Sequence, residues 1–299
     1  MLSLLHPLLA LLCAPLLIGI ITKVKALFAG RQGPTLIQPY HDLLKLLRKG
    51  AVFSQTTTWV FRLAPALGIA VSAVCLLFLP FGNLHALVSF QGDLIFVVYL
   101  LALFRFATVI AAMDTGSAFE GMGASREMTF SALAEPALLF ALAALARKTG
   151  GFALDDLIQG ITPALWLSSA PTLALVVAGL FLVYLAENSR IPVDDPTTHL
   201  ELTMIHEVMV LDHTGVDFGF IEYAASLKLW ILGSLIVGIA VPVRTGMLLV
   251  DLPVMCLSLA ALAVLVGIIE STVPRLRMHQ VPQLLVGACA FAVVGCLIQ

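Results

Sequence analysis

The sequence predicts an all-α integral membrane protein with about eight transmembrane helices and an amphipathic interfacial helix. Of its 299 residues, 60% are hydrophobic and only 11% are charged, whereas soluble globular domains are ~45–50% apolar and about a quarter charged. The apolar residues form runs of ~20, the length of a helix that crosses a bilayer. No soluble domain is left over, so residues 1–299 are predicted to form a single transmembrane domain. The formal net charge of −2 offers no basic surface for nucleic acid.

Eight predominantly apolar runs predict the transmembrane helices. The first run is followed, not preceded, by basic residues, Lys23 and Lys25, so it predicts a retained helix rather than a secretory signal. Polar segments and segments with Gly or Pro separate the later runs, as expected of loops. In chain order the runs lie near residues 3–22, 63–81, 93–113, 127–146, 164–186, 226–243, 247–269 and 282–298.

The distribution of Lys and Arg predicts the orientation. The first, third, fifth and seventh connections hold twelve basic residues, when Lys228, near the start of the sixth run, is counted with the fifth connection; the other connections hold three. Arg105, inside the third helix, is the sixteenth. By the positive-inside rule, both termini face outward from the cell (inner) membrane and the long loops face the cytoplasm. These cytoplasmic loops are expected at about residues 23–62, 114–126, 187–225 and 270–281.

The first cytoplasmic loop contains a predicted amphipathic helix. Its apolar residues recur at helical spacing with Lys45, Arg48 and Lys49 beside them, a pattern typical of a helix lying in the lipid interface. Such a helix is either a membrane-surface anchor or a lip that shapes an entrance from the membrane. The apolar positions are Leu36, Tyr40, Leu43, Leu44 and Leu47.

The third cytoplasmic loop is strongly acidic. Residues 187–225 carry eight carboxylates against one Arg, Arg190, for a net charge of −7. That charge is unfavourable beside anionic lipid headgroups. Pro192, Pro196 and several apolar residues argue against a freely solvated loop, and we favour a folded platform that docks a peripheral partner. The carboxylates are Glu187, Asp194, Asp195, Glu201, Glu207, Asp212, Asp217 and Glu222.

No motif indicates a catalytic, metal or cofactor site in this chain. His206-Glu207 begins like the zinc-protease HExxH, but Val210 stands where the second His is required. His199, His206 and His213 recur every seven residues, which on a helix would put them near one face. A metal site is the weaker interpretation, and partner contact or surface placement is favoured, since lone histidines titrate and hydrogen-bond without metals. The five cysteines are scattered through apolar runs without a CxxC pair, so any redox centre is expected on a partner subunit.

Ionisable residues at membrane depth mark a candidate pathway. Arg105 and Glu135 each lie about eight residues from the cytoplasmic ends of their helices, ~12 Å deep, and pair if their faces meet. Glu127 lies at the mouth of the fourth helix, and Asp114 and Glu120 lie in the preceding loop. Since intramembrane charges are costly, we interpret these five residues as a proton-relay entrance. A structural salt bridge with three surface acids is the alternative.

These residues carry a family resemblance. Asp114-Thr115-Gly116-Ser117, Gly123-Ala124-Ser125-Arg126-Glu127 and Glu135-Pro136 resemble the membrane subunit of formate hydrogenlyase and hydrogenase-4-type energy-converting complexes, which belong with subunit 1 of respiratory complex I, its quinone-junction subunit. Further similar segments are Gly33-Pro34 with Gln38, Pro39, Tyr40, Asp42 and Lys45; Ala186-Glu187 with Arg190, Pro192 and Asp194; and Glu270 with Arg275 and Arg277.

The resemblance implies a non-catalytic, eight-helix subunit that couples a peripheral electron-transfer arm to an antiporter-like membrane arm. It implies a peripheral hydrogenase-like large subunit, an iron–sulfur small subunit and antiporter-like membrane subunits as partners. Iron–sulfur clusters would lie on these partners, with a NiFe centre if the partner retains nickel. The implied entrance-lip residues are Gln38, Tyr40, Asp42 and Lys45. The implied coupling and docking residues are Glu187, Arg190, Asp194, Asp195, Glu201 and Glu207.

Two departures bear on quinone binding. Thr197 and His199 stand where quinone-using relatives place further glutamates, and the segment from Glu201 to Gly215 is longer than the usual form. The hydrogenase-type branch is therefore favoured over the alternative, the quinone-site subunit of an NADH:quinone oxidoreductase. A stand-alone ion transporter is a weaker alternative, since no clear internal repeat accompanies the acidic loop.

Overall fold

A computed structural model describes residues 2–194 and 204–298, and every regular element in these two ranges is a helix. Eight helices are long and apolar enough to cross a membrane, which confirms the predicted fold class. They are α1 (Leu5–Phe28), α3 (Trp59–Phe78), α4 (Asp93–Asp114), α5 (Ala118–Thr149), α7 (Pro163–Glu187), α8 (Gly215–Ala240), α9 (Leu248–Thr272) and α10 (Val281–Leu297). Shorter elements are α2 (Gln38–Leu47), α6 (Leu154–Gly160) and 3-10 turns at Leu2–Leu4, Glu207–Val210 and Met278–Gln280.

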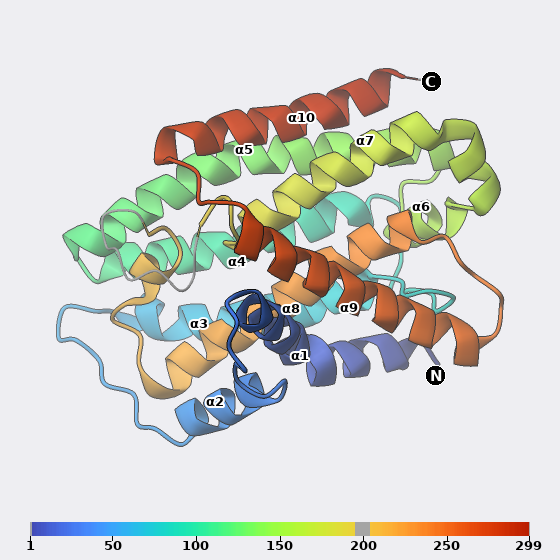
Figure 1. Cartoon of the computed structure of the whole chain (residues 1–299). Helices are drawn as coiled ribbons and strands as arrows, with labels where there is room; N and C mark the ends of the chain where they lie inside the picture. The colour runs from blue at the N-terminus through green and yellow to red at the C-terminus, as the bar shows by residue number, and fades with distance from the viewer. Residues whose placement is uncertain (1, 195–203, 299) are drawn as a thin grey trace.

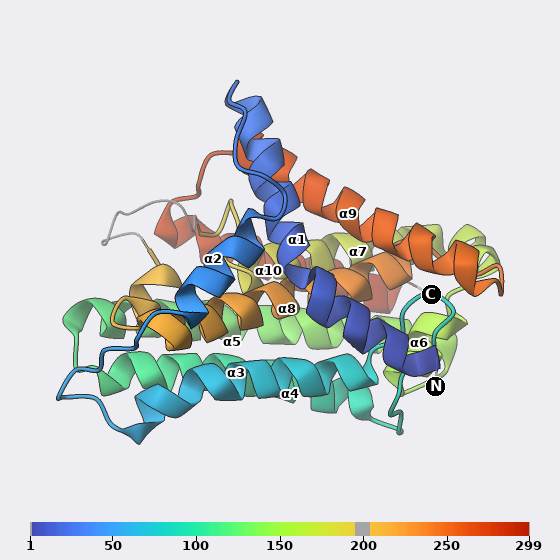
Figure 2. The ribbon, with the colours of Figure 1, turned by 90° about the horizontal axis from the view of Figure 1, so that it is seen from below.

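Helix α8 is the central element of the bundle (Figure 1). It packs against α1, α2, α3, α6, α7 and α9, and Figure 2 shows α3 and α4 on one side of it and α1 and α9 on the other. Helices α5, α7 and α10 form a second packed group. A helix that is apolar on all sides is expected to be buried, and α8 is the most buried of the eight spans.

Alternate connections gather at opposite ends of the bundle. We call one end the long-loop end, where residues 29–58, 115–117, 188–194, 204–214 and 273–280 meet. There Val52 N donates to Thr214 Oγ1 at 3.0 Å, and Leu276 N donates to Pro192 O at 3.0 Å. At the other, short-loop end, the Arg244 guanidinium donates to the carbonyls of Ile158, Gln159 and Ile161. Contacts between loops therefore fix both ends of the helices.

Two helices begin earlier than their apolar runs. Helix α8 begins at Gly215 rather than near residue 226, with Asp217 in its first turn, where the helix dipole favours an acid. Helix α5 begins at Ala118 rather than near residue 127, so only residues 115–117 separate it from α4. The physical reason is that their polar residues face other protein groups instead of lipid. Several residues assigned to loops are consequently helical.

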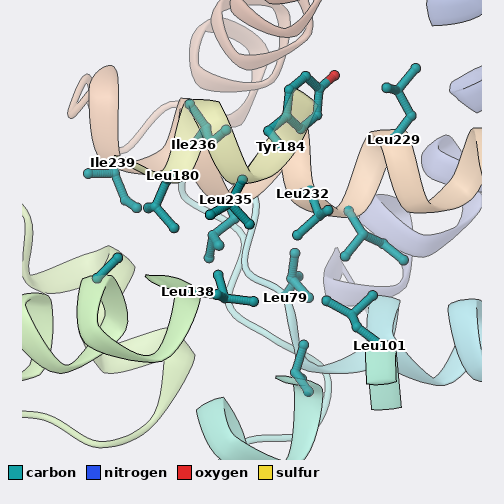
Figure 3. Packing of buried hydrophobic residues seen from close by; sticks show 14 of the residues in the cluster. Leu79, Leu101, Leu138, Leu180, Tyr184, Leu229, Leu232, Leu235, Ile236 and Ile239 are labelled. Carbon is teal, nitrogen blue, oxygen red and sulfur yellow. The ribbon is translucent and has the colours of Figure 1, made fainter. Parts of the chain in front are cut away.

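An apolar layer fills part of the bundle interior, and several of its residues are labelled in Figure 3. Its members surround a void of only about 20 Å³. A void lined by aliphatic side chains, without polar partners for water, stays dry. We call this set the leucine layer; it comprises Leu79, Leu94, Val97, Val98, Leu101, Leu138, Leu142, Leu154, Ile231, Leu232 and Leu235.

The predicted amphipathic helix is present as α2, and it packs against α1 and α8. Tyr40 Oη donates to Leu12 O at 2.5 Å, while Leu44 and Leu47 remain exposed. The connection before α2 lies so close to α1 that a Cβ on Gly19 would overlap the Leu36 carbonyl oxygen. Glycine at residue 19 is therefore required for this close packing of the α2 segment against α1.

Gly19→Ala is expected to displace α2 and to lower stability by about 1–3 kcal/mol, as overpacking does. Thermal unfolding in detergent and the rate of trypsin cleavage after Lys45 measure the two effects. Gly287→Ala on α10 is the matched control, because a Cβ there meets no atom within 4 Å. Equal unfolding temperatures and equal cleavage rates of the two variants would contradict the close packing of the α2 segment at Gly19.

Candidate functional site

Five charged residues form a connected group inside the bundle, which we call the charge chain: Glu135, Arg105, Glu127, Glu187 and Lys228. Arg105 Nη1 lies 2.8 Å from Glu135 Oε1, and its Nη2 lies 2.7 Å from Glu187 Oε1. Its Nε lies 3.6 Å from Glu127 Oε1. The second Glu187 oxygen, Oε2, lies 2.9 Å from Lys228 Nζ. Helices α4, α5, α7 and α8 thus meet through ion pairs.

The predicted pair of Arg105 and Glu135 is confirmed. Arg105 is buried at 5% exposure, as is the Glu187 side chain, but Glu135 retains 37% exposure. Glu187 was expected on the docking loop, whereas it closes α7 and is buried. Lys228 lies within α8, inside the predicted sixth run, and was not among the predicted site residues. A lysine within an otherwise apolar stretch requires a buried carboxylate. A single lysine inside an apolar run is therefore the sequence signal that could have identified Lys228.

A charged cavity of about 280 Å³ adjoins the charge chain. Glu270 anchors its wall: Lys25 Nζ lies 2.9 Å from Glu270 Oε2, and Arg190 Nη1 lies 3.5 Å from Glu270 Oε1. A cavity of this size with charged groups in its wall has room for several water molecules. The charged lining is Lys25, Glu187, Arg190, Glu207, Glu222, Lys228 and Glu270. The arrangement is suited to holding hydrated, exchangeable protons.

Asp194 is an internal anchor of the acidic loop rather than a surface contact. It is buried, and its Oδ1 lies 2.7 Å from Arg275 Nη2. Its Oδ2 accepts hydrogen bonds from the backbone N–H groups of Ile205 and His206 at 3.2 and 3.1 Å. Asp195, Glu201 and His199 lie outside the described residues. Glu207 begins a 3-10 turn and lines the charged cavity.

Asp114 and Glu120 are not joined to the charge chain by the described contacts. Asp114 Oδ2 accepts from Thr58 N at 2.6 Å, at the start of α3. Glu120 is buried and its Oε1 accepts from Asp212 N at 3.0 Å. The structure therefore gathers Arg105, Glu127 and Glu135 and places the other two acids at caps and loop contacts.

The entrance-lip residues surround a second cavity, the α2 cavity, of about 230 Å³. Gln38 and Asp42 line it, and Gln38 Nε2 donates to Asp42 Oδ1 at 2.9 Å. Tyr40 instead bonds α1, and Lys45 is exposed. Ile18, Thr22 and Glu222 line both this cavity and the charged cavity, so the two adjoin.

The histidines have separate surroundings. His213 is buried and stacks on Phe61, with ring centroids 3.8 Å apart, while His206 lines the charged cavity. Across residues 2–194 and 204–298, no group of three or more His, Cys, Asp or Glu is placed to hold a metal ion.

Glu187→Gln is expected to cost roughly 3–5 kcal/mol of stability, because it leaves the buried Arg105 and Lys228 short of a shared counter-charge. Glu135→Gln is the matched control, since Arg105 keeps Glu187 and Glu127. Thermal unfolding of the purified protein measures both variants. A Glu187→Gln protein as stable as Glu135→Gln would show that the interior does not depend on this carboxylate.

Segment 204–214 is expected to loosen in acid. Burial lowers the pKa of His213 from 6.5 to about 4, so protonation favours the detached segment and its stabilisation is lost as pH falls from 6.5 toward 4. Hydrogen exchange of this segment between about pH 7.5 and about pH 5 measures the effect. Burial lowers the pKa of His206, in the same segment, to about 4 as well. His213→Phe keeps a ring at residue 213 and should make the profile less steep, with the contribution of His206 remaining; the same steep profile in both proteins would exclude His213 as a cause.

Comparisons with known proteins identify the family. The profile of the NADH dehydrogenase family matches residues 1–298. Formate hydrogenlyase subunit 4 of Escherichia coli (strain K12) is 30% identical, over 97% of this chain and 96% of its own length. Hydrogenase-4 component C of the same organism is 32% identical, over 89% and 85%.

Wider matches extend to other complexes. One subunit of the NADH-quinone oxidoreductase of Syntrophotalea carbinolica is 26% identical, over 82% of this chain and 76% of its own length. A chain of the membrane-bound sulfane sulfur reductase, an archaeal respiratory membrane complex, has the same fold, with a TM-score of 0.84, 22% identity and coverage of 99% and 97%. The chain therefore belongs to the NADH dehydrogenase family, together with subunit 1 of respiratory complex I, as a multi-pass membrane subunit of a complex I-like hydrogenase or oxidoreductase complex.

Proposed function

We propose that this chain is the non-catalytic coupling subunit of an energy-converting hydrogenase complex of the formate hydrogenlyase or hydrogenase-4 type. It docks a peripheral electron-transfer arm at the long-loop end and links redox chemistry there to proton translocation. The observation that carries the proposal is the contact between the acidic loop and the charge chain. Asp194, Glu127 and Glu187 border one small cavity, and His206, held by Asp194, lines the charged cavity beside Lys228.

The coupling step follows from that contact. A docked partner that changes its charge on reduction displaces the loop segment anchored by Asp194. Displacement of His206 and Glu207 changes the polar wall of the charged cavity. It therefore changes how strongly Arg105 pairs with each of its three carboxylates. Glu127 and Glu135 then release or take up protons. Two arrangements of the loop are required for this coupling.

The remaining parts of the complex follow from the same assignment. The twelve-to-three excess of basic residues supports a cytoplasmic long-loop end in the cell membrane. A hydrogenase-like large subunit and an iron–sulfur small subunit dock there, carrying the iron–sulfur clusters. Antiporter-like membrane subunits continue the proton path. The two Escherichia coli relatives, both named for hydrogen-metabolising complexes, support this branch.

A quinone-site subunit is the second candidate, favoured by the α2 cavity that adjoins the charged cavity. At about 230 Å³, this cavity is smaller than the ~300–1,000 Å³ of ordinary ligand pockets. A quinone would require α2 to move outward. Quinone-dependent oxidation of the purified complex distinguishes this function from a hydrogenase, which transfers electrons to protons.

The proposal is tested in the complex purified from its native host in mild detergent. Mass spectrometry is expected to find hydrogenase-like and iron–sulfur subunits with this chain. In proteoliposomes, Glu127→Gln should lower proton pumping at least about tenfold, because one protonatable group contributes ~10²–10⁴-fold to proton transfer. Electron transfer to a soluble acceptor should persist, since the peripheral arm is unchanged.

Asp155→Asn is the matched control, because Asp155 pairs with His85 at the short-loop end, away from the charge chain. It should pump normally. Normal pumping by an assembled Glu127→Gln complex would remove Glu127 from the pathway, and a purified protein without redox partners would exclude the coupling function.

A further inference from the structure

Ser189, two residues beyond the end of α7, has a backbone conformation that favours glycine. Its φ is 51°, and in the part of the chain that the structure describes, every other residue with positive φ is a glycine. Ser189 N donates to Ala186 O at 3.1 Å, and Arg190 N donates to Leu185 O at 2.8 Å. This is the Schellman arrangement of hydrogen bonds, in which glycine is the usual residue because a Cβ is unfavourable at positive φ. Helix termination alone therefore does not explain a serine here.

The Ser189 side chain lies between two cavities. It lines the charged cavity and also the small cavity beside Glu127. Among the residues that line these two cavities, Glu187 alone shares this placement. Its Oε1 lies 2.7 Å from Arg105 Nη2, and its Oε2 lies 2.9 Å from Lys228 Nζ, so both oxygens are engaged. The Ser189 hydroxyl, by contrast, makes no hydrogen bond within the described part of the chain, and it is the free polar group between the cavities.

The sizes of the two cavities make this hydroxyl important. The charged cavity, at about 280 Å³, has room for several water molecules. The small cavity measures only about 10 Å³, at the lower limit of the ~10–15 Å³ that one water requires. A chain of water molecules therefore does not extend through the small cavity. A protein hydroxyl at its border can take the place of the missing water, since a hydroxyl both donates and accepts hydrogen bonds.

Glu127 is the carboxylate best placed to receive a proton from Ser189. Its ion pair with Arg105, at 3.6 Å, is the longest in the charge chain. Asp194 also borders the small cavity, but its Oδ1 pairs with Arg275 and its Oδ2 accepts two backbone N–H groups. The less tightly held carboxylate has more freedom to turn toward the hydroxyl.

We propose that the Ser189 hydroxyl is a proton-transfer link between the charged cavity and Glu127. A hydrated proton in the charged cavity forms a new O–H bond at Ser189 Oγ while the original O–H bond breaks and its proton passes to the Glu127 carboxylate. The serine is left neutral and unchanged, Glu127 gains one proton, and rotation about the Cβ–Oγ bond resets the hydroxyl. This inference rests on the proposed function, because it requires protons to move through the charged cavity.

Ser189→Ala in the complex purified from its native host tests the proposal. Alanine keeps the Cβ and removes only the hydroxyl, so assembly, unfolding temperature and electron transfer to a soluble acceptor should be unchanged. Proton pumping in proteoliposomes should fall at least about tenfold, as on loss of other proton-transfer groups. Ser258→Ala is the matched control, because Ser258 Oγ donates to Val254 O on α9 at 2.8 Å and lines neither cavity. It should pump normally.

The solvent isotope effect separates a proton-transfer role from a structural one. If the missing hydroxyl slows proton transfer, that transfer limits the rate, and pumping by Ser189→Ala should slow more in D₂O than pumping by the wild-type complex, because a deuteron is transferred more slowly than a proton. A structural defect lowers pumping by the same factor in both solvents, and that result would overturn the inference.

Ser189→Gly provides the second variant. It removes the unfavourable Cβ, so the protein should unfold at a temperature no lower than the wild type. A clearly lower unfolding temperature, or a Ser189→Ala chain that fails to assemble while Ser189→Gly assembles, would show that the serine is structural and would overturn the inference. Normal pumping by Ser189→Ala would do the same. These outcomes leave the Glu127→Gln test intact, whereas absence of redox partners from the complex overturns the proposed function itself.

Discussion

The buried guanidinium of Arg105 is the constraint on which the interior depends. A cation at 5% exposure within a membrane bundle is tolerated only with close counter-charges. Glu135, Glu127 and Glu187 supply them from α5 and α7, and Glu187 in turn holds Lys228 of α8. One set of ion pairs therefore fixes the rotation and depth of four helices. Apolar packing alone specifies that rotation and depth poorly, because one aliphatic surface resembles another.

The same helices build two different interiors. Toward the long-loop end, α4, α5, α7 and α8 present charged groups to a cavity of about 280 Å³; toward the other end they present the leucine layer, with a void of about 20 Å³. One half is suited to water and protons and the other excludes both. The boundary lies within about one turn of Arg105, Glu135 and Lys228, so the position of these residues in their helices decides where a polar path ends.

Sequence reasoning predicted the eight spans and the interfacial helix, because runs of ~20 apolar residues and amphipathic spacing have few other structures in lipid. It also predicted the Arg105–Glu135 pair from equal depth. It placed Glu187 in a loop, since a charged residue at the edge of an apolar run does not reveal whether the helix continues, and it gave Lys228 no place in the site. Glu187 closes α7 and Lys228 lies well inside α8. Contacts such as Asp194 with Arg275 join distant parts of the chain and leave no local pattern.

An acidic loop next to a buried charge network has two tasks that conflict. Under the proposed function its carboxylates meet a partner, yet Asp194 is turned inward to Arg275 and to the backbone of Ile205 and His206. Since those bonds hold the segment that borders the charge chain, the loop cannot shift without altering the charged cavity. A guanidinium with three carboxylates in reach has more than one favourable pairing. Under the proposed function, this excess of carboxylates over positive charges makes the interior responsive: a fully balanced pair would keep one protonation state, whereas a surplus carboxylate can release or take up a proton.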